Sequence, residues 1–156
     1  AERLFKQILP LVHEQDIPFN KSLVYGNYGD VLGHMKRYDE AIHMFSKAIH
    51  FAENVSDLCH IAFSTGLAKI LSLQGHHAKA VATTQSLDLA KIRPYKSTYI
   101  EILYGFTMIY FRASDHNQAM IFFAEAEELF HSDSQVQNND TSDKRSQAVA
   151  LLNDLL

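Results

Sequence analysis

Residues 27–49 have the sequence NYGDVLGHMKRYDEAIHMFSKAI, and this stretch decides the fold. In its second half, Ala41, Phe45 and Ala48 stand at i, i+4 and i+7, which places them on one face of a helix. The short joint Lys36-Arg37 separates this helix from a helical first half. We therefore expect two antiparallel helices that pack closely through small residues.

The same pattern returns along the chain at a constant distance. Ala41, Ala80 and Ala119 lie 39 residues apart, and each is followed at +4 and +7 by further residues of the same helix face. Recurrence at a fixed period is typical of proteins built from stacked helical repeats. Such arrays present a broad concave surface in place of a catalytic pocket, so the period favours a binding function.

Apolar residues recur at helical spacing over most of the chain, and no segment has the period-two alternation of a strand. Ser56-Asp57 and Ser114-Asp115 offer side chains that can cap the starts of helices. The polar stretch 132–141 predicts an exposed loop. The helices that we expect cover residues 1–14, 21–36, 38–54, 57–75, 77–92, 95–113, 115–131 and 142–155.

Residues 22–55 resemble a tetratricopeptide repeat. Asn27-Tyr28-Gly29 stands where the family has Asn-Leu-Gly, Leu32 falls on the large position of the first helix (helix A), and Tyr38 opens the second (helix B). The later units match less well but keep the same phase. The resemblance implies an all-α, right-handed superhelical array of antiparallel helix pairs, an α-solenoid. The family repeat has about 34 residues, and the additional residues of the 39-residue period fall between one helix B and the next helix A.

The resemblance also implies the division of the chain. Residues 1–13 align with helix B of a repeat, so we expect this chain to be a fragment of a larger protein. We expect one helical-repeat domain over residues 1–156, with a partial repeat at 1–14, repeats at 21–55, 57–93 and 95–131, and a terminal or capping helix at 142–155. The helix at 142–155 could also be the first helix of a further repeat.

Composition argues against several classes of partner. The formal net charge is −4, with acidic and basic residues mixed along the chain. No basic stripe is present that would bind phosphates, so we expect no nucleic-acid partner for this segment. No stretch approaches the roughly 20 apolar residues that span a bilayer, and the single Cys59 excludes an internal disulfide. We expect a cytoplasmic protein and leave open whether it forms a homo-oligomer.

Motifs for catalysis and for metal binding are missing. His13-Glu14 begins a string like HExxH, but Ile17 stands where the second histidine belongs. Gly26, Gly29 and Gly33 lack the Gly-Lys-Ser/Thr of a phosphate loop, and Gly29 is better explained as a small residue that lets two helices approach. We expect no metal, no cofactor and no enzymatic activity.

In the family, helix A of each unit lines the concave groove. Carried over residue by residue, the resemblance implies that Lys69 and Arg112 could hold a carboxylate. The lysines and asparagines with which some members clamp chaperone tails have no counterpart at the matching positions, so that ligand is disfavoured. The residues that we expect to contact a partner are Asp30, His34, Thr65, Lys69, Ser72, Glu101, Tyr104, Met108 and Arg112.

Two hypotheses for function follow from these observations. In the first, the chain is a non-catalytic module that binds a peptide or a helix of a partner protein in the groove. In the second, it is the sensor or regulatory segment of a larger signalling protein (a transcription regulator, kinase or cyclase) whose output domain lies outside this chain. Sequence beyond residues 1 and 156 would separate them.

Overall fold

The computed structural model describes residues 1–14 and 16–153. Over these residues the chain is all-α, as predicted, with eight α-helices and no strand. The last two residues of the helix expected at 142–155 lie outside this part of the chain. The helices are α1 (Glu2–Glu14), α2 (Pro18–His34), α3 (Tyr38–Ala52), α4 (Asp57–Leu73), α5 (His77–Gln85), α6 (Lys96–Arg112), α7 (His116–Ser132) and α8 (Asn139–Asn153), with 3₁₀ turns η1 (Leu89–Ile92) and η2 (Ser134–Val136).

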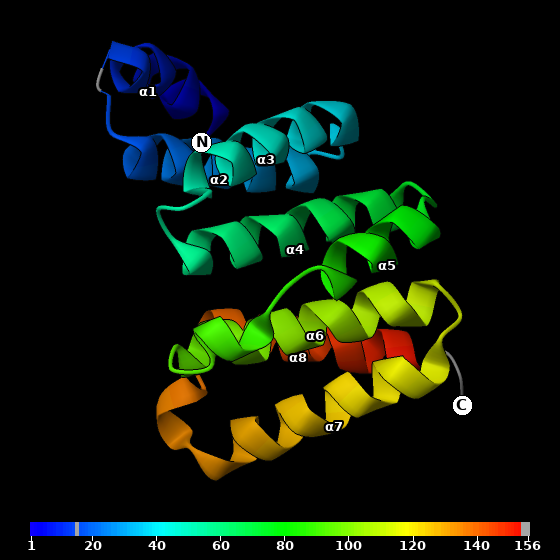
Figure 1. Cartoon of the computed structure of the whole chain (residues 1–156). Coiled ribbons are helices and arrows are strands. Elements are labelled where there is room, and N and C mark those ends of the chain that lie inside the picture. The colour runs from blue at the N-terminus through cyan, green and yellow to red at the C-terminus, as the bar shows by residue number, and fades with distance from the viewer. Residues whose placement is uncertain (15, 154–156) are drawn as a thin grey trace.

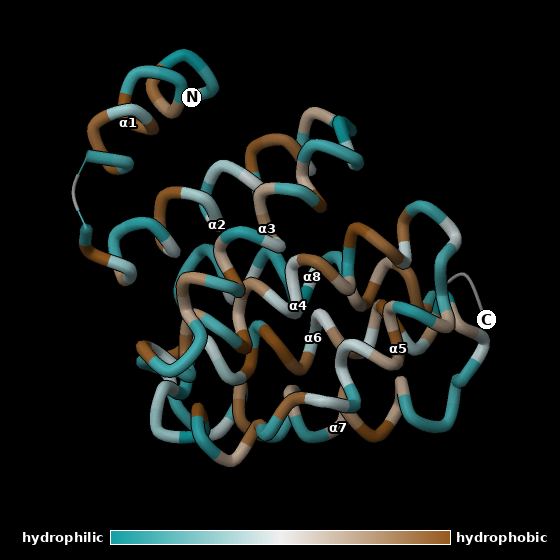
Figure 2. The backbone as a smooth tube through the Cα atoms, turned by 45° about the horizontal axis from the view of Figure 1, so that its top comes forward, coloured by the Kyte–Doolittle hydropathy of each residue, from teal (hydrophilic) through white to brown (hydrophobic). Residues whose placement is uncertain are grey.

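The helices form antiparallel pairs that are stacked in chain order (Figure 1). α2 pairs with α3, α4 with α5 and α6 with α7, and each pair packs on the next one along the chain. α1 lies against α2 at one end, and α8 lies behind α6 in Figure 1. Hydrophobic and hydrophilic segments alternate along α1 and α7 in Figure 2, as expected where one face of a helix is buried. α6 differs, because it is buried on all sides from Ile102 to Tyr110. This arrangement is a helical-repeat solenoid.

Three of the helical hairpins turn in the same way, at the repeat period. Lys36, Gly75 and Ser114 adopt the left-handed conformation, with φ of 59°, 83° and 63°. In each joint the amide of this residue donates to the carbonyl three residues earlier, and the next amide donates to the carbonyl five residues before itself. This pair of bonds is the Schellman ending of a helix. The repeat is therefore present in the backbone as well as in the side chains.

The expected helix caps are also present. The Ser56 side chain accepts a hydrogen bond from the Cys59 amide at 3.2 Å, and the Asp115 side chain accepts one from the Gln118 amide at 3.1 Å. Each bond satisfies an amide that has no partner within its own helix. The predicted starts of α4 and α7 are confirmed in this respect.

The stretch 132–141 is more ordered than the exposed loop that its polar sequence predicts. Val136 is buried within η2, and α8 begins at Asn139 instead of residue 142. The Asn138 side chain accepts a hydrogen bond from the Thr141 amide at 2.9 Å. Asparagine is a strong N-cap residue, which explains the earlier start of α8.

α8 packs in the manner of the first helix of a fourth unit. Ile70, Ile109 and Ala148 follow one another at 39-residue intervals, on α4, α6 and α8. Ile70 packs over Gly33 of α2, where an added Cβ would lie 2.8 Å from its Cδ1 atom. Ala148 is fully buried in the hydrophobic cluster that surrounds α6. α8 thus packs on α6 and has a buried residue at the position that Ile70 and Ile109 hold on α4 and α6.

α5 is much shorter than the helix expected at 77–92. It ends at Gln85, and the chain then turns into η1. The Ser86 hydroxyl donates to the Thr83 carbonyl, three residues back, at 2.8 Å, and the Asp88 side chain then caps η1. Such local bonds at the end of α5 compete with a further turn of the helix. Periodicity alone does not reveal this competition.

The core lies between the helix pairs. All three alanines that mark the period are fully buried. Phe45 fills the space between α2 and α4 because Gly29 and Gly66 leave room for its ring. An added Cβ on these glycines would lie 3.1 Å and 2.7 Å from the ring. The predicted packing role of Gly29 is therefore confirmed.

Candidate partner-binding groove

A hollow of about 390 Å³ opens among the first helices of the four units. α2, α4, α6 and α8 all contribute to its lining, so it lies on the face of the array that the resemblance assigns to the groove. One row of lining residues shows how the repeat builds it: Asp30, Lys69, Met108 and Gln147 stand 39 residues apart, one on each of these helices. We call this hollow the groove.

Small residues provide the space. Thr65, Gly66 and Gly105 line the groove. An added Cβ on Gly66 would lie 2.7 Å from the Phe45 ring, and one on Gly105 would lie 3.2 Å from the methyl carbon of Thr65. Close packing between successive helices therefore keeps these positions small and leaves the volume above them open.

Two lysines from different helices meet in the groove. Lys69 lies on α4 and Lys144 on α8, and both line the hollow. Desolvation by the groove lowers the pKa of Lys69 to about 8, and repulsion by the nearby Lys144 is the next largest cause. Within residues 1–14 and 16–153, no carboxylate oxygen lies within 4.0 Å of either ammonium nitrogen. The fold therefore keeps two adjacent cations together without a counter-ion in contact, at a cost in stability.

Carboxylates lie on both sides of the lysines. Asp30 is accessible to water, but the walls of the groove desolvate it and raise its pKa, while Lys144 and Lys69 act in the opposite direction. Desolvation also raises the pKa of Glu101, which accepts a hydrogen bond from the Thr141 hydroxyl at 3.1 Å. The groove thus holds separated charges of both signs.

The structure brings most of the predicted site residues together. Those that line the groove are Asp30, His34, Thr65, Lys69, Glu101 and Met108. Ser72, Tyr104 and Arg112 lie outside it. Their separation follows from how α4, α6 and α7 pack.

Tyr104 packs against α7 and is fully buried. Its ring contacts Phe123 and Phe130, and its hydroxyl donates to Glu127 at 2.7 Å. Ser72 is buried near the end of α4 and Arg112 is partly buried at the end of α6. In the described part of the chain, the Ser72 hydroxyl and one Arg112 nitrogen have no hydrogen-bond partner.

The groove residues on α8 are absent from the sequence-based prediction. Asp140, Asp143, Lys144 and Gln147 all line the hollow. The period contains the signal that would have found them, because Gln147 lies 39 residues after Met108. The predicted contact residues come only from the three full repeats, so this signal was not used.

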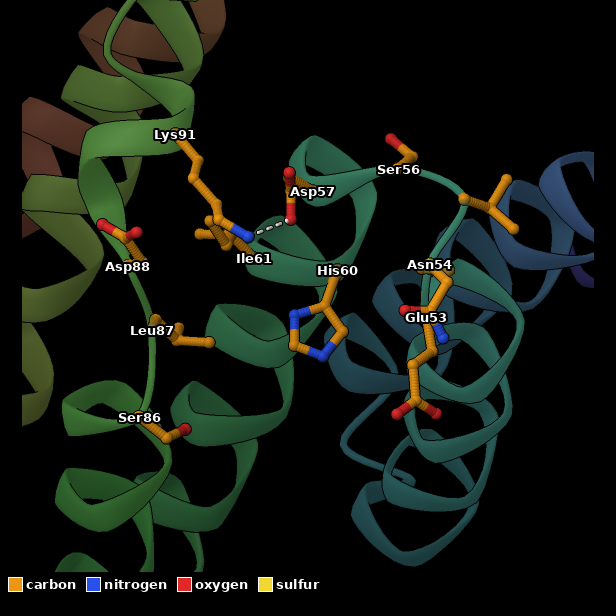
Figure 3. A pocket seen from close by; sticks show the side chains of 12 residues that line it. Glu53, Asn54, Ser56, Asp57, His60, Ile61, Ser86, Leu87, Asp88 and Lys91 are labelled. Atoms are coloured by element: carbon orange, nitrogen blue, oxygen red, sulfur yellow. Dashed lines mark hydrogen bonds and ion pairs between the residues drawn. The ribbon is translucent and has the colours of Figure 1, made fainter.

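A second hollow, of about 460 Å³, lies away from the groove (Figure 3). It forms where the joint between α3 and α4 meets the segment between α5 and η1, which is where the lengthened repeat carries its additional residues. His60 projects into it, between Glu53 on one side and Leu87 on the other. Lys91 and Asp57 form an ion pair at 2.9 Å along its edge. Its charged lining is thus already paired in part.

The described residues contain no group of three or more His, Cys, Asp or Glu side chains that could hold a metal ion. None of the helices in that part of the chain has the length and apolar character needed to cross a membrane.

Comparison with known families bears out the resemblance in the first full unit. Residues 23–54, which span α2 and α3, match the tetratricopeptide repeat family. With its stacked pairs of antiparallel helices, the chain is a tetratricopeptide-like helical-repeat protein. Repeats of this family generally serve as non-enzymatic protein–protein interaction modules. No curated protein and no solved structure matches the chain.

Proposed function

We propose that this chain is a non-catalytic interaction module that binds a peptide or a helix of a partner protein in the groove between α2, α4, α6 and α8. One observation carries the proposal: the groove contains charged side chains that are desolvated but not ion-paired with one another. A partner that supplies opposite charges would offset, on binding, the free energy that desolvation of these charges costs.

The free, buried thiol of Cys59 supports a reducing compartment such as the cytoplasm.

Photo-cross-linking in the full-length protein tests the location of the partner. A benzophenone amino acid is placed at Thr98 or Gln147, which line the groove, and at the exposed His43 on α3 as the control. We expect a discrete cross-linked partner from the two groove positions and none from His43. Equal cross-linking at all three positions would contradict the proposal.

Obstruction of the groove tests whether the cross-linked partner depends on it. Gln147→Trp places a large ring at the edge of the hollow, and Gln118→Trp makes the same change at an exposed site on α7. With the purified partner, calorimetry is expected to show weaker binding for Gln147→Trp alone. Both variants replace surface residues, so their melting temperatures should stay close to that of the parent protein.

A further inference from the structure

The arrangement of charges in the groove narrows the kind of peptide that would bind there. Lys69 of α4 and Lys144 of α8 are close neighbours in the groove. Asp30 of α2 is influenced by both lysines. Glu101 lies on α6, and its charged neighbours are Asp140 and Lys144 of α8. Taken by helix, the order is negative on α2, positive on α4 and negative on α6, and Lys144 of α8 adds a second positive charge beside Lys69.

We propose that the groove selects a partner segment in which an acidic side chain stands between two basic ones. The acidic side chain bridges the ammonium groups of Lys69 and Lys144, and the basic side chains reach Asp30 on one side and Glu101 with Asp140 on the other. The inference rests on the proposed function, since it names the chemistry of the partner that the same groove binds.

The balance of charges excludes a simple anion as the preferred ligand. Four carboxylates line the groove, those of Asp30, Glu101, Asp140 and Asp143, against the two lysines. A free carboxylate or phosphate would gain the attraction of the lysines but would also meet the surrounding negative charge. A segment that carries both signs in the complementary order avoids this repulsion, and the arrangement also disfavours segments with the opposite order.

The two lysines repel each other when no partner is bound. Ammonium groups that lie side by side in a desolvated hollow repel each other, and this repulsion helps to depress the pKa of Lys69. A bridging carboxylate would reverse the effect and raise that pKa. Binding near pH 8, where free Lys69 is only partly protonated, should therefore take up protons.

Defined peptides test the charge order. The probe is Ac-Ala-Lys-Ala-Glu-Ala-Lys-Ala-NH₂, which in an extended conformation presents all three charges on one face. Its control, Ac-Ala-Glu-Ala-Lys-Ala-Lys-Ala-NH₂, has the same composition and net charge with the acid at one end. Sodium acetate serves as the free carboxylate. Binding to the full chain is followed by shifts of backbone amide resonances in α4 and α8.

We expect the peptide with the central Glu to bind at least several-fold more tightly than its rearranged control, and acetate to bind more weakly than either. Lys69→Gln and Lys144→Gln should each remove this preference, whereas Lys79→Gln on the exposed face of α5 should keep it. In buffers of different ionisation enthalpy, calorimetry at pH 8 should show proton uptake that disappears in Lys69→Gln. Equal affinity for the two peptides, or an unchanged preference in both groove variants, overturns the inference.

The melting temperature distinguishes a binding role of the lysines from a role in stabilising the fold. If repulsion by Lys69 outweighs the attraction of Lys144 to Asp30 and Glu101, Lys144→Gln should raise the melting temperature of the free protein. A lower melting temperature would mean that Lys144 is held by stabilising contacts, which contradicts the inference. The proposed groove function and the proposed charge order of the partner can be disproved separately. A partner that cross-links only in the groove but ignores both lysine variants leaves the groove function standing, whereas cross-linking that is not confined to the groove removes that function itself.

Discussion

Lys36 and Ser114 lie two repeat lengths apart and adopt nearly the same left-handed backbone conformation, with φ of 59° and 63°. Each ends the helix A of its unit with the same two hydrogen bonds. Gly75 occupies the equivalent place in the unit between them, with φ of 83°. Only glycine adopts this conformation without strain from a Cβ atom.

This relationship predicts changes of stability with opposite signs. Ser114→Gly relieves strain and should stabilise the chain by about 0.5–1 kcal/mol, whereas Gly75→Ala introduces it and should cost about 1 kcal/mol. Urea unfolding of both variants measures the difference. Destabilisation by Ser114→Gly would show that its side chain contributes more than the backbone loses.

Ala80 lies at a helix crossing in the second unit, where a larger side chain would be overpacked. Ala80 is fully buried, so Ala80→Leu overpacks the helix crossing and should cost roughly 1–3 kcal/mol. Ala78→Leu makes the same change at an exposed position of the same helix and should leave the urea midpoint nearly unchanged. If both variants unfold like the parent protein, the assigned repeat register is wrong.

The ring of Phe63 limits the space for a side chain at Gly26. An added Cβ would lie 2.1 Å from the Phe63 ring, which packs directly over this glycine. Gly26→Ala should therefore destabilise the chain by about 1–3 kcal/mol. In a Phe63→Ala background the obstruction is gone, and Gly26→Ala should become neutral or stabilising because alanine favours a helix more than glycine does. Chemical denaturation of the four proteins completes this double-mutant cycle, and an equal cost in both backgrounds would rule out the contact as the cause.

The attachment of α8 depends on Arg145. Its guanidinium donates to both oxygens of Glu127, at 2.7 Å and 2.8 Å, and lies over the Phe130 ring of α7. Arg145→Ala leaves Glu127 without these bonds and should cost about 1–3 kcal/mol. Hydrogen exchange should accelerate in α8 before it does in α4. The control Arg93→Ala removes an exposed ion pair with Glu125 and should change stability little; an equally small effect of Arg145→Ala would contradict the prediction.

The depressed pKa of Lys69 predicts how stability depends on pH. In the folded state this pKa is about 8, against 10.5 for the unperturbed side chain. Between these values the unfolded chain binds more protons than the folded one, so the contribution of Lys69 to stability rises with pH. We expect this rise to be on the order of 1–2 kcal/mol after solvent screening. The free energy of unfolding is measured against pH for the parent protein and for Lys69→Met, and the difference between the two curves isolates the contribution of Lys69. A difference that does not change between pH 8 and 10 would refute the lowered pKa of Lys69.

Sequence predicts the helix pairs well because their determinants are local. The alanines at the crossings, the tight joints and the caps at Ser56 and Asp115 all stand in the sequence at recognisable spacing. The position of α8 in the repeat is not marked by such local signals. Where the earlier units have the large residues Tyr28, Leu67 and Phe106, α8 has Arg145, whose polar side chain depends on Glu127 for its place.

The same difference explains what was missing from the predicted site. The contact residues were predicted only for the three full repeats, so Lys144 was not among them and the lysine pair was not anticipated. Tyr104 was expected in the groove from its position in the repeat, but it packs against α7 and donates to Glu127. That contact within the α6–α7 pair is tertiary, and the local pattern around Tyr104 does not encode it.

The row formed by Asp30, Lys69, Met108 and Gln147 has a consequence for how such a groove can change. Each side chain comes from a separate helix, and none of the three crossing alanines is part of the row. Asp30, Lys69 and Gln147 lie outside the hydrophobic core, whereas Met108 is buried within it. In the proposed binding mode, a substitution at one of the first three therefore alters one point of contact with the partner while the packing between units stays intact. Specificity at these positions could then diverge one helix at a time, on a scaffold that need not change with it.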